Sequence, residues 1–187
     1  MALLLAQKTG KTDISILSPF SIRTDKKTEN LIGLFINTFP VRIQVDQSIG
    51  ANDFVDAVST KIKYLMDFVQ LPFEHVTQHI EDWDQSTRFD VGFTLQSQIL
   101  AGNSFSSSEI EEHQKADKMP TNLWFDMALM QNGVDCIIFY SDDLWMESEI
   151  RELWNEYTDL IQSILADPSA NPITMNQQDK LSIRLNL

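Results

Sequence analysis

The chain has 187 residues, and its 27 acidic and 14 basic side chains give a formal net charge of −13 with the three histidines neutral. Hydrophobic residues make up 43% of the sequence and aromatic residues 10%, which is enough for a packed core and too much for a disordered chain. The acidic balance and the lack of a lysine or arginine stripe exclude a protein that binds nucleic-acid phosphates, and they argue against adhesion to an anionic membrane. The length fits one domain or one lobe of a larger domain.

The single cysteine, Cys136, excludes an internal disulfide framework and is typical of a reducing compartment. No apolar run approaches the roughly 20 residues that span a bilayer, and the apolar stretch Ala2–Ala6 is too short for a signal-peptide core, which needs about 7 to 15 residues. We therefore expect a soluble, cytoplasmic protein with no nucleic-acid or membrane partner.

The first part of the chain predicts a helix followed by two strands. Residues 2–8 are helix-forming and stop just before Gly10, a residue type that commonly ends helices. Residues 13–20 alternate and are rich in β-forming side chains, and residues 31–46 are extended apolar sequence that ends in the alternating segment FPVRIQVD. Each of these two segments predicts a strand, and the polar residues 23–30 predict a connector between them.

Two helices are expected next. From Asn52 onward apolar residues recur at spacings of three and four, which predicts an amphipathic helix of four to five turns that ends before Pro72. The apolar face of this helix comprises Phe54, Val58, Ile62, Leu65, Met66 and Val69. Because proline is favoured at the first helical position, a second, shorter helix is predicted from Pro72 to about Trp83.

The remaining sequence predicts three strands and a closing helix. Apolar alternation predicts strands at Phe89–Gln96, Leu123–Met130 and Val134–Tyr140, and an Asn-Gly pair before the last strand suits a tight hairpin turn. A helical apolar period predicts a helix at Glu147–Leu165, whereas residues 97–119 lack regular periodicity, as functional or mobile loops do. The order contains no regular βαβ alternation, so the fold class is an α/β (α+β) two-layer sandwich, with a mixed sheet and helices on one face.

Three patterns suggest chemistry, and each has a simpler structural interpretation. The segment Gln7–Thr12 ends like a phosphate-binding P-loop but lacks its first glycine and precedes a strand, so a glycine turn from helix to strand is favoured. His75 and His79 have the spacing of zinc ligands on a helix, yet no third ligand is apparent, which favours a solvated helix face. Cys136 lies mid-strand among apolar residues, which favours a buried structural thiol over a nucleophile. The residues alone therefore predict no self-sufficient catalytic or metal site.

The block Ile32–Arg42 (IGLFINTFPVR) resembles the I-G-x-F-x-N-T-x-x-x-R motif of the condensation domains of nonribosomal peptide synthetases, enzymes of secondary metabolism. About thirty residues on, Leu71–Glu74 (LPFE) is similar to the end of the family's H-x-Q-D-x-P-F-E motif, with Phe68 at the histidine position and Gln70 at the aspartate position. Upstream, Thr9–Arg23 resembles the family's T-G-x-x-D-strand-to-Arg segment. The motif residues in this chain are Gly33, Asn37, Thr38, Arg42, Pro72, Phe73 and Glu74. The resemblance covers nearly the whole chain.

The resemblance implies a chloramphenicol-acetyltransferase-like fold of two lobes, with donor and acceptor thioesters entering a tunnel between the lobes on the 4'-phosphopantetheine arms of carrier proteins. The acceptor amine attacks the donor thioester and forms a peptide bond. The family's H-H-x-x-x-D-G motif belongs to the N-terminal lobe and is absent from this chain, so residues 1–170 resemble the C-terminal lobe, which we expect to be inactive alone. Residues 171–187 resemble the start of a linker toward an adenylation domain.

The implied partners are the N-terminal lobe, peptidyl carrier proteins and the adjacent adenylation domain, and no directly bound cofactor or metal is implied. By the same resemblance Arg23 pairs across the lobe interface with the aspartate of the absent motif; its alternative is an ordinary surface charge. Residues 97–119 correspond to a latch segment that crosses to the other lobe. For Asn37 and Thr38 we expect capping and strand-end hydrogen bonds rather than chemistry.

Two other functions stay open at this point. One is a non-catalytic recruitment or docking module for carrier proteins, which would have kept the fold and lost the chemistry. The other is an acyl-CoA transferase of the same superfamily, which is weaker because the D-F-G-W-G loop of the plant branch is absent from this chain.

Overall fold

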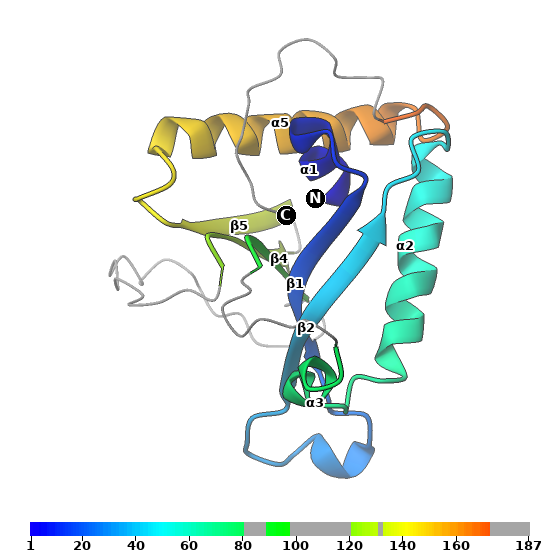
Figure 1. Ribbon diagram of the computed structural model, residues 1–187, viewed down its shortest axis with the longest axis vertical. Helices are drawn as coiled ribbons and strands as arrows, with labels where there is room; N and C mark the ends of the chain where they lie inside the picture. Colours follow the sequence, from blue (N-terminus) through cyan, green and yellow to red (C-terminus); the bar gives the residue numbers. More distant parts are fainter. Residues whose placement is uncertain (81–88, 98–120, 131–132, 173–187) are drawn as a thin grey trace.

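The computed structural model describes residues 1–80, 89–97, 121–130 and 133–172, and Figure 1 shows how their elements are arranged. The elements in chain order are α1 (Ala2–Thr9), β1 (Asp13–Ser21), the 3₁₀ turn η1 (Lys26–Thr28), β2 (Ile36–Gln44), α2 (Ala51–Met66), α3 (Phe73–Thr77), β3 (Val91–Ser97), β4 (Leu123–Met130), β5 (Gly133–Tyr140) and α5 (Glu147–Ala166). The predicted succession of helices and strands is confirmed. Among the described residues, no helix has both the length and the apolar character needed to cross a bilayer.

The five strands form one mixed sheet in the order β2-β1-β3-β4-β5. The outer pairs, β1 with β2 and β4 with β5, are antiparallel, whereas β3 is parallel to both of its neighbours. The register places Ile14 opposite Ile43 and Phe125 opposite Ile138, so the apolar halves of the alternating patterns share one face of the sheet. The mixed sheet expected from the sequence is confirmed.

The hydrophobic core lies on that face, beneath the helices. Buried residues of α1, α2 and α5 join the apolar residues of the strands in one cluster, to which Leu5, Phe54 and Leu153 each contribute a buried side chain. Figure 1 shows α5 across one end of the molecule with α1 against it, and α2 running alongside β2. The helices thus form a second layer on one face, as expected from the sequence.

The turn between α1 and β1 accounts for the sequence of the P-loop-like segment. α1 ends at Gly10, which adopts a left-handed conformation (φ 71°) and donates its N–H to the carbonyl of Ala6 over 2.9 Å. Glycine takes this conformation without steric cost, and β1 follows three residues later. The interpretation of this segment as a glycine turn from helix to strand is confirmed.

Three of the predicted elements are shorter in the structure. α2 ends at Met66, so Val69, which the periodicity placed on the apolar face of this helix, lies in the loop after it. The strand predicted over residues 31–46 is observed as β2 at Ile36–Gln44, and residues 31–35 belong to the preceding loop. α3 ends at Thr77, and Pro72 is its N-cap rather than its first helical residue. The N–H of His79 then bonds to a carbonyl three residues back, so the chain leaves α3 in tighter 3₁₀-type turns. The end of the predicted helix lies outside the described residues.

The segment after α5 packs against the beginning of α2. The carbonyls of Pro168 and Ala170 accept hydrogen bonds from two N–H groups of the first turn of α2, over 2.9 and 3.1 Å. This approach depends on Gly50, because a Cβ at that position would lie 2.5 Å from the carbonyl oxygen of Ser169. Pro172 is fully buried. The chain is therefore packed against the rest of the fold up to Pro172, which includes the first two residues of the predicted linker, and the rest of that linker lies outside the described residues.

Candidate functional site

Most of the motif residues singled out by the sequence lie near one end of the sheet. Arg23 follows β1, Asn37 is the second residue of β2, and Phe73 begins α3, which packs against β2. Figure 1 shows α3 and the loop between β1 and β2 at the same end of the molecule. Arg42 lies five residues beyond Asn37 along β2, about 17 Å away at the usual rise of a strand. The structure thus gathers the motif residues around the start of β2, with Arg42 apart from them.

Arg23 holds the β1–β2 loop, residues 22–35, in one shape. One terminal nitrogen of its guanidinium donates to the carbonyl of Thr28, and the other donates to the carbonyl of Leu31 over 2.9 Å. The guanidinium carbon lies 4.0 Å from the centroid of the Phe35 ring, in a cation–π contact. Two hydrogen bonds and a ring contact are more than an ordinary surface charge would make, so Arg23 organises its own loop.

Other polar contacts fix the first part of the same loop. The Asp25 carboxylate accepts the N–H of Lys27 over 3.0 Å and caps η1. The side-chain amide of Gln70 donates to the hydroxyl of Thr24 over 2.6 Å, which joins the β1–β2 loop to the α2–α3 loop, residues 67–72. Residue 70 is where the resemblance expects an aspartate, and glutamine supplies the donor for this contact.

Asn37 joins the start of β2 to the α2–α3 loop. Its side-chain nitrogen donates two hydrogen bonds, to the carbonyl of Val69 over 2.8 Å and to the carbonyl of Leu71 over 2.7 Å. A primary amide has two N–H donors, so this nitrogen is fully used. The expected hydrogen-bonding role of Asn37 is thus found, directed at a loop 32 to 34 residues away rather than at its own strand.

The neighbouring Thr38 has no such role among the described residues. It lies opposite Pro19 in the β1–β2 ladder, on the other face of the sheet from Asn37. Its hydroxyl makes no hydrogen bond to any residue that the structure describes. Of these two adjacent motif residues, only Asn37 anchors another segment through its side chain in the described part of the chain.

Replacing Asn37 by Ala is expected to lower the free energy of unfolding by about 1–2 kcal/mol, because the carbonyls of the buried Val69 and the exposed Leu71 lose their donor. Urea unfolding monitored by circular dichroism measures this change. Thr38→Ala is the matched control, expected to stay within about 0.5 kcal/mol of the parent. Equal effects of the two substitutions would contradict the anchoring role of Asn37.

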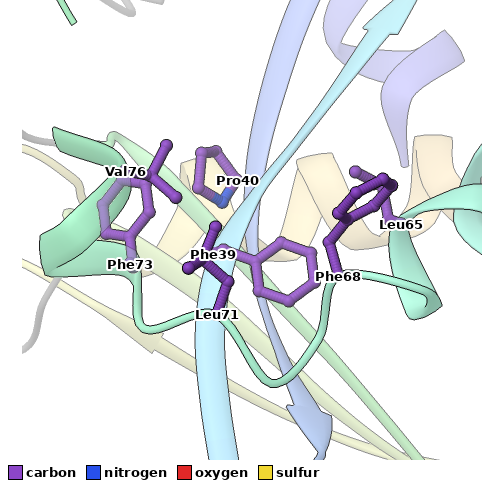
Figure 2. Close-up of a pocket in the computed structure, with 7 residues that line it drawn as sticks. All are labelled: Phe39, Pro40, Leu65, Phe68, Leu71, Phe73 and Val76. Carbon is purple, nitrogen blue, oxygen red and sulfur yellow. The ribbon is translucent and has the colours of Figure 1, made fainter. Parts of the chain in front are cut away.

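An apolar pocket of about 160 Å³ lies beside the anchored loop, and Figure 2 shows the side chains around it. Its lining comes from β2, the end of α2, the α2–α3 loop and α3, and consists of Phe39, Pro40, Leu65, Phe68, Leu71, Phe73 and Val76. None of these side chains carries a polar atom, so the pocket offers apolar contacts and no catalytic group. Phe68, which stands where the family motif has histidine, is part of this lining.

Of the remaining motif residues around the loops, Gly33 and Pro72 have structural roles, whereas the Glu74 side chain has no partner in the described part of the chain. A Cβ at Gly33 would lie 3.2 Å from the ring of Phe35, so the small residue leaves room for the ring that stacks under Arg23. Pro72 precedes α3, where its fixed φ of −58° suits the entry into a helix. Glu74 lies exposed in the first turn of α3, and its carboxylate makes no hydrogen bond or ion pair to any residue in the described part of the chain.

Arg42 forms an ion pair at the far end of β2. Its guanidinium donates to both oxygens of the Asp13 carboxylate, over 2.9 Å from Nε and 2.5 Å from a terminal nitrogen. These hydrogen bonds hold the pKa of Asp13 below its usual value. Both side chains are exposed, and exposed pairs contribute little stability, so Arg42 serves the β1–β2 pairing rather than the gathered residues.

The other chemical candidates do not form a site in the described part of the chain. There, no three His, Cys, Asp or Glu side chains gather where a metal ion could bind, and the imidazole of His79 is hydrogen-bonded to the carbonyl of His75 over 2.8 Å. Cys136 is half-buried rather than buried, and its burial, with the nearby Asp126 carboxylate, raises the thiol pKa to about 11. A thiol with this pKa stays protonated at neutral pH and is a poor nucleophile.

Asp90 is a buried carboxylate that the alternating pattern placed on the solvent side of a strand. It lies just before β3 and accepts a hydrogen bond from the side-chain amide of Asn122, just before β4, over 2.7 Å. Burial raises its pKa, and the hydrogen bond from Asn122 opposes that rise. The strand begins at Val91, two residues later than predicted, so Asp90 joins the starts of two neighbouring strands instead of facing water.

The fold defines the class of protein. The chain superposes on the X-domain from teicoplanin biosynthesis with a TM-score of 0.78 and 18% sequence identity, covering 95% of this chain and 42% of that one. It superposes on the starter condensation domain of the rhizomide synthetase RzmA with a TM-score of 0.69 and 12% identity, covering 96% of this chain and 43% of that one. The fold is therefore that of condensation domains, seen over less than half of their length.

The condensation-domain family model matches residues 1–180, so the chain belongs to the condensation-domain family. It is 28% identical over 174 residues to one of the subunits of the linear gramicidin synthase of Brevibacillus parabrevis, covering 90% of this chain and 2% of that protein. It is 27% identical over 175 residues to surfactin synthase subunit 1 of Bacillus subtilis (strain 168), covering 88% of this chain and 5% of that protein. The chain thus spans a small fraction of the length of these relatives.

Proposed function

We propose that residues 1–170 are the C-terminal lobe of a nonribosomal peptide synthetase condensation domain. The observation that carries the proposal is a single five-stranded lobe whose family match extends over residues 1–180 and which covers 42–43% of solved chains of the same fold. Relatives named as subunits of a linear gramicidin synthase and a surfactin synthase, and one named as a nonribosomal peptide synthetase, support the same assignment. Residues 171–187 then begin the linker toward an adenylation domain.

In the complete enzyme the reaction joins two carrier-bound substrates. The acceptor amine attacks the carbonyl carbon of the donor acyl or peptidyl thioester, a C–N bond forms and the C–S bond breaks. The proton lost by the amine ends on the departing sulfur, so the donor carrier leaves as the free thiol. Both substrates arrive on 4'-phosphopantetheine arms of carrier proteins, so the lobe itself binds no cofactor. Its share of the work is to form one wall of the tunnel that the arms enter.

The catalytic base lies outside this lobe in the proposal. The chain has three histidines, His75, His79 and His113, and no two of them are adjacent as the family's H-H-x-x-x-D-G motif requires. His75 and His79 are exposed on and after α3. The lobe therefore supplies shape and positioning, and the general acid–base chemistry belongs to the N-terminal lobe.

Arg23 is proposed to link the two lobes. Its terminal nitrogens already serve the carbonyls of Thr28 and Leu31, which orients the guanidinium before any partner arrives. A guanidinium has five N–H donors, so three remain, including the one on Nε, and an aspartate of the N-terminal lobe would pair with them. The proposed latch, residues 97–119, would be a segment of this chain that crosses to the other lobe. Nearly all of it lies outside the described residues.

The chain alone is expected to form no peptide bond. The test supplies one carrier protein loaded with an aminoacyl donor and one loaded with an aminoacyl acceptor, and it measures dipeptidyl carrier by intact-protein mass spectrometry. The natural polypeptide that contains both lobes is the matched positive arm. Turnover by the 187-residue chain would contradict the proposal. Carrier binding by both proteins with product from neither would favour the recruitment-module function instead.

A further inference from the structure

The β1–β2 loop carries an exposed apolar tip. Residues 31–36 read LIGLFI, and four of the five side chains in this run are exposed. Ile32 is fully exposed and Leu34 is 85% exposed, whereas Phe35 is partly covered by the guanidinium of Arg23. Consecutive exposed apolar residues mark interaction sites, because soluble proteins rarely leave such runs in water without a functional reason.

The tip is held open by its own loop. The hydrogen bonds from Arg23 to the carbonyls of Thr28 and Leu31 fix both sides of the loop, and the Phe35 ring packs under the same guanidinium. A flexible loop could fold its aliphatic side chains inward, but these contacts keep Ile32 outside. A preformed tip loses little conformational entropy when it binds, so the arrangement suits an interface.

We propose that this tip, residues 31–36, packs against the other lobe of the condensation domain, an inference that rests on the proposed function. The length of the solved relatives supports this occupant: more than half of the teicoplanin X-domain and of the rhizomide starter domain has no counterpart in these 187 residues. Figure 1 shows the loop projecting from the end of the sheet where the motif residues gather. A second copy fits less well, because two chains of net charge −13 repel each other and the tip carries no charge to offset this.

The test compares the double variant Ile32→Ser/Leu34→Ser in two settings, the 187-residue chain and the natural polypeptide that contains both lobes. In the 187-residue chain the substitutions should shift Tm by less than about 1–2 °C, because the side chains are already in water. In the two-lobe protein, hydrogen exchange at residues 31–36 should be at least about tenfold slower than in the 187-residue chain, and the double variant should abolish that protection. Leu144→Ser/Leu165→Ser, two exposed leucines on other elements, is the matched control.

Three outcomes would overturn the inference. Exchange at residues 31–36 could be equally fast in both proteins, or the control pair could remove the protection as well as the tip pair does. In the third, analytical ultracentrifugation would find the 187-residue chain dimeric and the double variant monomeric, which would make a second copy the occupant. Peptide formation is measured separately, so a two-lobe protein with a protected tip and no turnover would contradict the proposed function and leave this interface standing.

Discussion

Replacing Lys8 by Met is expected to lower the free energy of unfolding by about 3 kcal/mol. Lys8 of α1 pairs with Glu156 of α5, and their side chains are only 7% and 25% exposed. The second oxygen of Glu156 is buried and has no hydrogen-bond partner among the described residues. Removal of the ammonium group therefore strands a carboxylate with little access to water, which typically costs about 3–5 kcal/mol. Urea unfolding measures the loss.

Two further variants separate the buried charge from other effects of the substitution. The double variant Lys8→Met/Glu156→Leu removes both charges, and it should recover to within about 1 kcal/mol of the parent because apolar replacements of buried pairs are often neutral. Arg151→Met breaks the exposed pair with Glu147 on α5, where the expected loss is below about 0.5 kcal/mol. If Lys8→Met cost no more than Arg151→Met, the burial argument would be wrong.

The sequence predicted the elements because local periodicity carries them. The helical apolar pattern after Glu147 and the alternation in Leu123–Met130 each matched an observed element to within a residue at most of their ends. Where a prediction failed, tertiary contacts had overridden a local signal. Leu31–Phe35 is as apolar as the strand it precedes, yet Arg23 binds a carbonyl and a ring in this stretch and holds it as a loop.

Contacts between residues far apart in the chain could not be predicted in this way. Lys8 and Glu156 are 148 residues apart, and nothing in either local pattern indicates the other. The two carbonyls that Asn37 holds are backbone groups, which no motif of side chains records. The family motif singled out Asn37, and the structure adds what it holds.

The apolar pocket shows the same division between local and long-range information. Periodicity placed Leu65 on the apolar face of a helix, and the family motif marked Phe68 only as a departure from the expected histidine. The pocket arises because Asn37 holds the α2–α3 loop beside β2, which brings Phe68 near Phe39 at the pocket wall. A single substituted motif position thus gains a physical meaning only after the loop is placed.

Replacing Gly92 by Ala is expected to lower the free energy of unfolding by about 2–3 kcal/mol, although alanine normally favours a strand over glycine. A Cβ at this position would lie 2.1 Å from Cε3 of Trp124, the residue paired with Gly92 on β4. The indole cannot simply swing away at no cost, because its N–H donates to the hydroxyl of Thr94 over 3.0 Å. Urea unfolding of the variant measures the result.

A double-mutant cycle with Trp124→Ala isolates the steric cause. Once the indole is gone, Gly92→Ala should be neutral or stabilising by a few tenths of a kcal/mol, so the coupling free energy between positions 92 and 124 should be about 2–3 kcal/mol. Thr94→Val provides a second arm: it removes the hydrogen bond that holds the indole, so the cost of Gly92→Ala should fall in that background. Additive effects of Gly92→Ala and Trp124→Ala would rule out the proposed clash, because residues that share no contact add independently.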